Sequence, residues 1–364
     1  MKKMRVAIIG QGRSGRDIHG RFFLSDANEK VEVACIVEKS PSRREKAKQE
    51  FGCDVVADYT ELFDRDDIDV VINASFSQMH YPIAKDLLAH GFHVLNEKPF
   101  ARTTYECMDL INTAKSHGCS VTAFHQTLMT PAFQQVKDVI ASGKLGRILQ
   151  VNLKYSGFSR RWDWQTLQAF CGGSVYNSGP HPIGQALDLL GWDEKTQVIY
   201  SRLDTVQTSG DAEDYAKILL TAPGKPVVDI EINCADAFAG DFTFKIFGSN
   251  GTYISDNTNY KLKYVERETL SEMPLIRHSL SNADGNPAYC SEKLDIHEES
   301  GAIQGSSFDV AVKNFYDSLY DTVMLGKAPV VSPEMAMQVI NVIETCHAQN
   351  PLPVKFDDRV EYTD

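Results

Sequence analysis

Short apolar runs rich in β-branched residues alternate with helical stretches along the first third of the chain. The runs that predict strands cover residues 6–9, 31–37, 55–57, 70–73, 93–96 and 120–124. The stretches that predict helices cover residues 14–24, 42–51, 81–90 and 104–117. This alternation is typical of a parallel sheet covered by helices on both faces. We therefore expect an α/β fold that begins with a doubly wound parallel sheet.

The pattern changes after Pro131. One helix is expected at residues 132–142, and strand-like runs follow at residues 148–155, 198–203, 215–221, 227–233, 242–248 and 251–255. Successive strands without intervening helices favour an antiparallel sheet. This pattern thus predicts a C-terminal α+β domain with a large, mostly antiparallel open sheet. We place the domains at residues 1–124 and 125–364, with long loops at 265–305 and a closing helix at 333–347 that packs back on the first domain.

Length, charge and cysteine content narrow the class of protein. A chain of 364 residues exceeds the usual size of one core, which agrees with two domains. The net charge of −12 repels nucleic-acid phosphates and anionic lipid, so we expect neither as a partner. The eight cysteines lack metal-binding spacing and indicate free thiols, with no bound metal. With no export signal and no apolar run of roughly 20 residues, we expect a cytoplasmic protein.

A glycine motif opens the first predicted helix. Gly10, Gly12 and Gly15 form the spacing G-x-G-x-x-G directly after an apolar strand, with Arg13 and Ser14 inside the motif. Such glycines let the backbone turn tightly and approach a pyrophosphate at the helix N-terminus. The motif in this position predicts a dinucleotide-binding Rossmann domain, and its five named residues are candidate cofactor contacts.

The end of the second predicted strand bears on the choice of dinucleotide. Glu38 follows that strand at the distance expected for a residue that binds the adenosine ribose. A carboxylate there accepts a hydrogen bond from the 2′-hydroxyl and repels a 2′-phosphate, which favours NAD over NADP. Lys39, Arg43 and Arg44 stand nearby and keep NADP as the alternative.

Several further motifs carry a resemblance that extends over nearly the whole chain. They are the glycine fingerprint, the loop ending in His80, the triplet Glu97-Lys98-Pro99, the sequence Ser142-Gly143-Lys144-Leu145-Gly146, and Gly172-Gly173 followed by His181. In this order they resemble the Gfo/Idh/MocA family of NAD(P)-dependent sugar and polyol oxidoreductases, which includes inositol dehydrogenases.

The resemblance implies roles for particular residues. It places Lys98 between the nicotinamide and the substrate hydroxyl, where a cation polarises the reacting oxygen. It makes His181 a catalytic residue that binds substrate. It also makes Asn177 a residue of the catalytic and substrate-binding site. Asn177 stands where the family commonly has an aspartate, so it can orient an imidazole or a substrate hydroxyl but cannot carry a proton. Further cofactor contacts are expected at Ser75, Ser77, His80, Glu97 and Gln126, besides Lys98 itself.

A cluster of aromatic and charged residues precedes the histidine segment. Trp162 and Asp163 combine a flat apolar face with a hydrogen-bonding group, as sugar sites often do, so we expect both to contact substrate. The alternative is a packed aromatic beside a solvent-exposed ion pair.

These observations predict a NAD-dependent enzyme that oxidises a secondary hydroxyl of a sugar, glycoside or cyclic polyol to a ketone. His181 would accept the hydroxyl proton and Lys98 would stabilise the alkoxide. The alternatives are a glycoside-processing enzyme that uses NAD in a transient redox step, and a dinucleotide-binding regulatory or scaffold protein whose catalytic site has decayed. The resemblance also implies a homodimer or homotetramer.

Overall fold

The first sheet of the protein is parallel, as the sequence pattern predicted. The computed structural model describes residues 2–305 and 307–356. Six strands run in the order β3-β2-β1-β4-β5-β6. Their bounds are β1 (Met4–Ile9), β2 (Val31–Val37), β3 (Asp54–Val56), β4 (Val70–Asn73), β5 (His93–Asn96) and β6 (Val121–Ala123). The order reverses beside β1, and the carboxyl ends of strands at such a point form a crevice for ligands.

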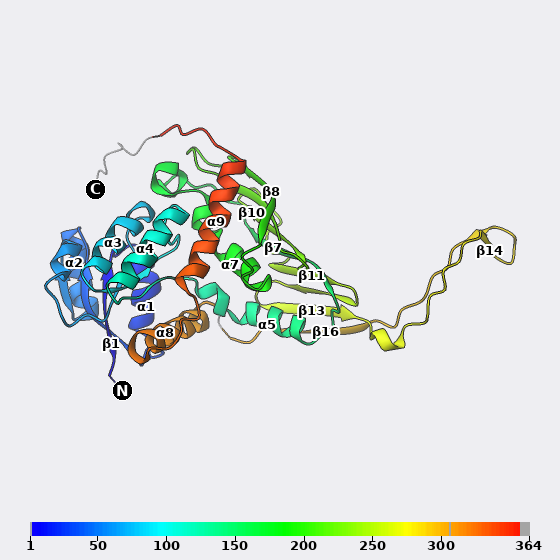
Figure 1. Ribbon diagram of the computed structural model, residues 1–364, viewed down its shortest axis with the longest axis horizontal. Helices are drawn as coiled ribbons and strands as arrows, with labels where there is room; N and C mark the ends of the chain where they lie inside the picture. The colour runs from blue at the N-terminus through cyan, green and yellow to red at the C-terminus, as the bar shows by residue number, and fades with distance from the viewer. Residues whose placement is uncertain (1, 306, 357–364) are drawn as a thin grey trace.

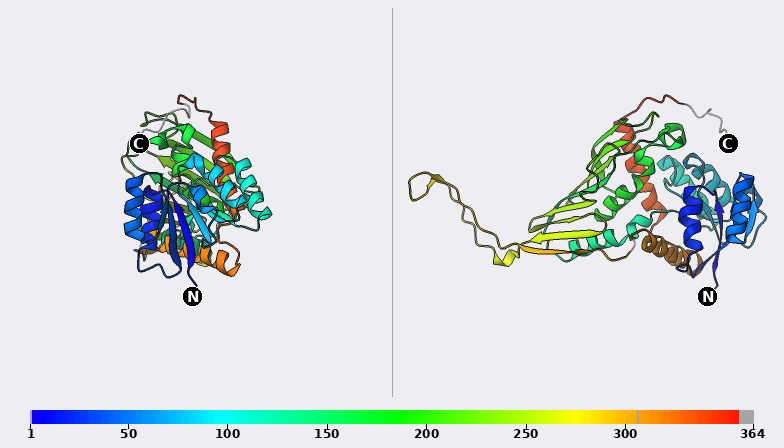
Figure 2. Two further views of the ribbon diagram at one scale, coloured as in Figure 1. Left: turned by 90° about the vertical axis from the view of Figure 1, so that its left-hand side faces the viewer. Right: turned by 180° about the vertical axis from the view of Figure 1, so that it is seen from behind.

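Helices pack on both sides of this sheet (Figure 1, Figure 2). They are η1 (Arg13–Gly20), α1 (Arg21–Phe23), α2 (Pro41–Phe51), η2 (Tyr59–Leu62), η3 (Ser77–Met79), α3 (His80–Ala89) and α4 (Thr104–Ser116). The central strands are apolar on both faces because both are covered, and Val6, Ile8, Ile36 and Ile72 are fully buried. Gly52 ends α2 with a φ of +62°, a left-handed conformation that favours glycine.

The second sheet has eight strands and is mostly antiparallel, as expected. Its order is β16-β13-β12-β11-β7-β10-β9-β8, and only β7 and β10 are parallel. The strands are β7 (Ile148–Ser156), β8 (Gln197–Asp204), β9 (Tyr215–Thr221), β10 (Val227–Asn233), β11 (Phe244–Gly248), β12 (Gly251–Ser255), β13 (Asn259–Tyr264) and β16 (His297–Ala302). Helices α5 (Pro131–Ala141) and α7 (Pro180–Leu189) cover its buried face, where the Phe133 and Phe244 rings lie 6.0 Å apart.

The last two helices bring the C-terminal part of the chain back to the first sheet. In α8 (Ser307–Leu325), the Tyr316 hydroxyl lies 2.6 Å from His19 Nδ1 of η1. The Thr104 hydroxyl of α4 donates to Glu344 of α9 (Pro333–Gln349) at 2.5 Å. The predicted domain boundary after residue 124 falls between β6 and η4 (Gln126–Met129) and stays a prediction. Residues 357–364 of the predicted second domain lie outside the described residues.

The expectation of long loops over residues 265–305 is wrong in part. Strand β16 lies inside this range, and its polar sequence gives no apolar alternation because it is an edge strand held by its ladder to β13. Between these strands, residues 265–296 form an arm that extends away from the body (Figure 1). The arm carries η7 (Arg267–Thr269) near its base and a hairpin of β14 (Leu280–Ser281) and β15 (Pro287–Ala288) at its tip.

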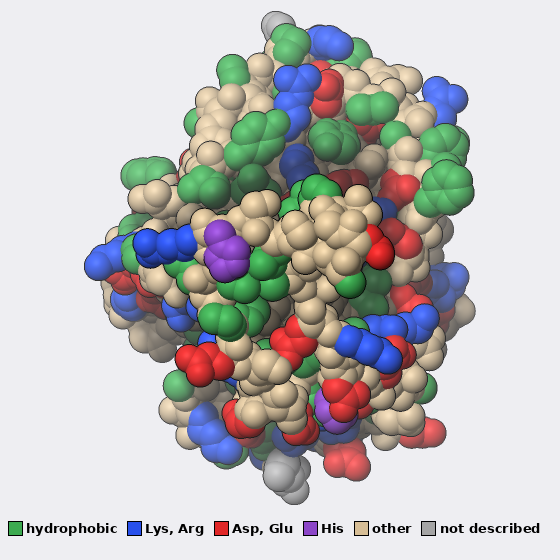
Figure 3. Space-filling model, turned by 90° about the vertical axis from the view of Figure 1, so that its right-hand side faces the viewer, with side chains coloured by type: hydrophobic (Ala, Val, Ile, Leu, Met, Phe, Trp, Pro, Cys, Tyr) green, Lys and Arg blue, Asp and Glu red, His purple; other side chains and the backbone are tan. Residues whose placement is uncertain are grey.

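Charged side chains of both signs lie on the surface (Figure 3). Figure 3 shows basic and acidic side chains interspersed over the face at the base of the arm. None of the helices in the described part is both long and apolar enough to cross a membrane. The eight cysteines, all in the described part, are free thiols.

Candidate active site

The turn after β1 has room for a ligand on one side only. A Cβ on Gly10 would lie 2.6 Å from the carbonyl oxygen of Ala74, and one on Gly15 would lie 1.9 Å from that of Gly10. Both positions therefore require glycine. Beyond its two chain neighbours, no heavy atom of the described residues lies within 4 Å of where a Cβ on Gly12 would stand, so this backbone borders open space at the start of η1. Arg13 and Ser14 lie in the first turn of that helix, the former exposed.

Glu38 lies against the same turn. Its carboxylate accepts hydrogen bonds from the backbone N–H groups of Gln11 and Ser40, both at 2.9 Å, and pairs with Arg43 at 3.0 Å. Burial opposes ionisation, but these donors outweigh it and the pKa of Glu38 is lowered. The structure thus places the ionised carboxylate of Glu38 beside the glycine turn, paired with the Arg43 side chain.

Glu97 and Lys98 follow β5 at the carboxyl edge of the sheet. Glu97 is buried, and its Oε1 lies 3.1 Å from His19 Nε2 while its Oε2 accepts the N–H of Lys98. Burial would raise the pKa of Glu97, but contact with His19 and the nearby Lys98 lowers it to about 2. A buried chain of contacts, Tyr316 to His19 to Glu97, therefore supports the backbone that carries Lys98.

Lys98 reaches across to the second part of the chain. Its Nζ lies 2.6 Å from the carbonyl oxygen of Asn177 and 3.2 Å from Asn177 Oδ1. Asn177 ends α6 (Ser174–Asn177), which follows η5 (Trp164–Thr166) and η6 (Gln168–Phe170). Burial lowers the pKa of Lys98, and the positive charges of Arg161 and Arg13 act in the same direction. The structure thus brings together two predicted site residues that are far apart in sequence.

His181 lies at the start of α7, on the same side of the cleft as Asn177. Its Nδ1 lies 3.2 Å from the hydroxyl of Thr127 in η4. Burial, the charge of Lys98 and the neighbouring His125 lower the pKa of His181 to about 3. The imidazole is therefore neutral at physiological pH. His125 itself is buried, with an Nδ1 that has no hydrogen-bond partner among the described residues.

The other predicted cofactor residues differ in how free their side chains are. His80 is buried, and its two ring nitrogens contact the carbonyl oxygens of Pro99 at 2.7 Å and Ser75 at 3.3 Å. These contacts hold the loop after β4 against the Lys98 segment, a structural role. Ser75 donates to Asn73 Oδ1 at 2.7 Å, while Ser77 is buried at the start of η3.

The aromatic segment contacts the loop after β4. Trp164 packs edge-to-face on Phe76, with ring centroids 5.0 Å apart, so it bridges the two parts of the chain. Trp162 is 83% exposed, and Asp163 pairs with Arg161 at 2.8 Å. The alternative to substrate contact was a packed aromatic ring beside a solvent-exposed ion pair. The Arg161–Asp163 ion pair is present, but the packed ring is that of Trp164, since Trp162 is exposed. Substrate contact by Trp162 and Asp163 stays a prediction.

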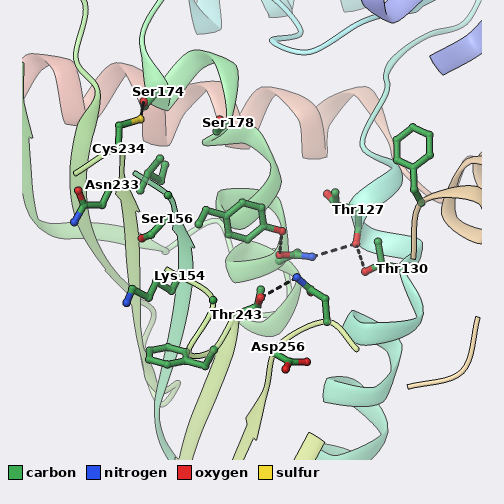
Figure 4. A pocket seen from close by; sticks show the side chains of 18 of the residues that line it. Thr127, Thr130, Lys154, Ser156, Ser174, Ser178, Asn233, Cys234, Thr243 and Asp256 are labelled. Atoms are coloured by element: carbon green, nitrogen blue, oxygen red, sulfur yellow. Dashed lines mark hydrogen bonds between the residues drawn. The ribbon is translucent and has the colours of Figure 1, made fainter. Parts of the chain in front are cut away.

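A cavity of about 650 Å³ lies between the second sheet, η4 and α8 (Figure 4). Sequence reasoning missed most of its polar residues, including Lys154, Gln185, Asn233 and Asp256. They lie on strands, on α7 and on one turn, where a polar residue looks like any other exposed position. Gln126, predicted as a cofactor contact, lines this cavity.

The residues at the carboxyl edge of the first sheet fit a dinucleotide. Open space beside Gly12, the adjoining N-terminus of η1 and the Glu38 carboxylate match the needs of a pyrophosphate and a ribose. Among the described residues, no three histidine, cysteine or acidic side chains lie where they could hold a metal ion.

A glycine turn of this kind, with a lysine held against Asn177 and a histidine four residues beyond it, is the arrangement expected of a NAD(P)-binding oxidoreductase. Residues 4–125 match the model of the oxidoreductase family with the NAD-binding Rossmann fold, and residues 133–254 match the GFO/IDH/MocA C-terminal domain. The chain belongs to the Gfo/Idh/MocA family, which confirms the resemblance seen in its sequence.

Curated relatives are distant. The NADP⁺-dependent scyllo-inositol 2-dehydrogenase IolW of Bacillus subtilis is 25% identical over 348 residues, covering 94% of this chain and 92% of that protein. The uncharacterized oxidoreductase YdgJ of Escherichia coli is 26% identical over 72% of this chain and 75% of its own length.

Solved structures share the fold over almost the entire length. The putative oxidoreductase yvaA of Bacillus subtilis has a TM-score of 0.78 at 20% identity and covers 95% of this chain and 96% of its own. KijD10 of Actinomadura kijaniata, a 3-ketoreductase solved with NADP and TDP-benzene, has a TM-score of 0.75 at 18% identity, covering 95% of this chain and 98% of its own.

Proposed function

We propose that this chain is a NAD-dependent dehydrogenase that oxidises a secondary hydroxyl of a sugar, glycoside or cyclic polyol to a ketone. The observation that supports this most is the approach of Lys98 Nζ to the Asn177 carbonyl, 2.6 Å away, with His181 four residues further along the chain. Alcohol oxidation needs a cation at the reacting oxygen and a neutral base for its proton. The distant inositol dehydrogenase relative supports the substrate class.

Lys98 and His181 have different roles in the proposed reaction. Bound nicotinamide supplies the hydride acceptor. Lys98 donates a hydrogen bond to the substrate hydroxyl and stabilises negative charge as it forms on that oxygen. In the tautomer in which Nδ1–H of His181 donates to Thr127, the Nε2 lone pair accepts the hydroxyl proton. Because the low pKa of His181 makes it a weak base, the positive charge of Lys98 supplies much of the driving force for proton release.

The choice of NAD is also a proposal. The Glu38 carboxylate lies beside the glycine turn, where it repels a 2′-phosphate. Arg43 pairs with that carboxylate and has an exposed side chain, which is the strongest observation in favour of NADP. The names of IolW and of the KijD10 structure both specify NADP, which also favours NADP as the alternative. We further propose a homodimer or homotetramer in the cytoplasm.

The test is the absorbance of reduced nicotinamide when purified protein and NAD⁺ are offered a panel of inositols, monosaccharides and glycosides. We expect this absorbance to rise with at least one neutral polyol or sugar, and we expect Lys98→Met to abolish the rise. Tight cofactor binding with no rise for any alcohol would contradict the dehydrogenase and favour the decayed, dinucleotide-binding protein. Cleavage of a glycoside with no net reduction would favour the transient-redox enzyme.

A further inference from the structure

The cavity on the second sheet adjoins the proposed reacting centre. Thr127 lines it, and the hydroxyl of this residue lies 3.2 Å from His181 Nδ1. Ser178, which directly follows Asn177, lines it as well. A substrate whose hydroxyl lies between Lys98 and His181 would therefore extend the rest of its structure into this space.

Buried polar atoms of the cavity wall lack partners within the described chain. Gln126 is 6% exposed, and its Oε1 accepts no hydrogen bond from the described residues. The buried hydroxyl of Ser156 is likewise unpaired. Unsatisfied polar groups are costly in a protein interior, and ligand hydroxyls can satisfy both. Figure 4 shows the adjoining wall fixed by a chain of hydrogen bonds from Tyr155 through Gln185 to Thr127.

The charges around the cavity disfavour an anion. Lys154 and Asp256 are the charged residues that line it. Lys154 Nζ lies 2.7 Å from Asp236 and 3.0 Å from Asp241, so two carboxylates already hold its positive charge. Hydrogen bonds from Thr258 and Asn259 lower the pKa of Asp256, which is ionised at neutral pH. A phosphate placed here would face the Asp256 carboxylate and an ammonium group that two other carboxylates already pair.

The size of the cavity suits a ligand larger than one sugar ring. Ligand pockets of about 300–1,000 Å³ hold drug-sized molecules, and this cavity of about 650 Å³ falls in the middle of that range. Phe242 and Phe308 also line it and offer apolar faces to a pyranose.

The geometry points to an uncharged glycoside of about disaccharide size as the substrate, with its distal sugar unit in this cavity and with phosphorylated and nucleotide-linked sugars excluded. This inference rests on the proposed function, because the oxidised unit is placed at Lys98 and His181. Direct binding tests it separately from turnover.

The experiment is calorimetric titration of the full chain with reduced cofactor present, so that no alcohol is oxidised during the titration. The probes are matched pairs: trehalose and trehalose 6-phosphate, sucrose and sucrose 6-phosphate, cellobiose and cellobiose 6-phosphate, together with UDP-glucose. We expect the neutral member of at least one pair to bind at least tenfold more tightly than its phosphate. Asp256→Asn removes one carboxylate, so it is expected to narrow that ratio several-fold. Asp138→Asn, at an exposed position of α5, is the control and is expected to leave the ratio unchanged.

The outcomes separate the two proposals. Tighter binding of a phosphate or of UDP-glucose than of any neutral sugar overturns the inference and leaves the dehydrogenase standing. Failure of every neutral disaccharide to bind, while the cofactor binds, also overturns it. Neutral disaccharide binding with no oxidation of any alcohol contradicts the dehydrogenase and leaves the cavity assignment intact.

Discussion

Lys98 Nζ lies 2.6 Å from the backbone carbonyl oxygen of Asn177, and this contact joins the edge of the first sheet to the helical segment that precedes the second. Both Asn177 oxygens that approach the ammonium group are uncharged. The cation is therefore oriented without being neutralised at this contact. Burial lowers the pKa of Lys98, so its proton is held less tightly than in water. These properties suit a group that must stabilise a forming alkoxide.

Replacing this cation should slow the oxidation step and leave the affinity for the cofactor unchanged. We expect Lys98→Met to reduce kcat for alcohol oxidation by a factor on the order of 10² to 10⁴, the range for a positioned acid–base or electrostatic group. Fluorescence titration with reduced cofactor should show little change in Kd. Lys46→Met, at an exposed position of α2, is the matched control. Turnover within a few-fold of the unmodified chain would exclude the role proposed for Lys98.

Asn177 allows the charge of the site to be changed without a change of shape. In Asn177→Asp a carboxylate takes the place of the Oδ1 atom that lies 3.2 Å from Lys98 Nζ. An added negative charge favours the protonated forms of Lys98 and of His181, so both pKa values rise. Oxidation needs His181 neutral and Lys98 charged, so the acidic and basic limbs of the kcat/KM profile should both move to higher pH. An unmoved acidic limb would show that His181 is not the base.

Glu38 is expected to set the choice of dinucleotide. Glu38→Ala should weaken NADH binding and strengthen NADPH binding, changing the ratio of the two Kd values roughly tenfold or more, because repulsion of the 2′-phosphate is lost and Arg43 is released. The carboxylate also accepts hydrogen bonds from the backbone N–H groups of Gln11 and Ser40. Glu38→Gln removes the charge but keeps a hydrogen-bond acceptor, so it distinguishes the effect of the charge from the support of the loop. Glu45→Ala on α2 is the control. Tighter NADPH than NADH binding by the unmodified chain would contradict the assignment.

Local signals carried most of what could be predicted. The glycine turn was predictable because Gly15 packs on the backbone of Gly10, only five residues earlier, and the parallel sheet was predictable from the alternation of strands and helices. The placement of Lys98 was predictable because it follows a strand of an open parallel sheet, and the carboxyl ends of such strands border the ligand crevice.

Contacts between distant segments could not be predicted. Nothing in the sequence pairs Lys98 with the carbonyl of Asn177, because that contact depends on how the two parts of the chain pack. The same holds for the buried contact of His19 with Glu97, and for Tyr316 beyond it. Helix α8 was missed, although the apolar spacing of Ala311, Phe315 and Leu319 is a helical signal. The polar cavity residues carry no local signal at all.

The buried His125 gives the chain a pH-dependent stability. This residue is 2% exposed, and burial is the main reason that its pKa falls to about 4. Between pH 6.5 and 4 the unfolded chain takes up a proton on this residue that the folded chain does not. The free energy of unfolding therefore falls as the pH drops through this window. His181, with its pKa lowered to about 3, acts in the same direction.

Removing His125 should reduce that acid sensitivity. In His125→Gln, the loss of unfolding free energy between pH 7 and pH 5 should be smaller than in the unmodified chain by about 2 kcal/mol, because an unfolded histidine with an ordinary pKa gains that much from protonation. The measurement is denaturant unfolding at both pH values, followed by circular dichroism. The difference between the two pH values is the readout, so a general loss of stability on substitution cancels. His117→Gln, at an exposed position, is the control and should keep the original slope. An equal slope in His125→Gln and the unmodified chain would show that His125 protonates in the folded state as readily as in water.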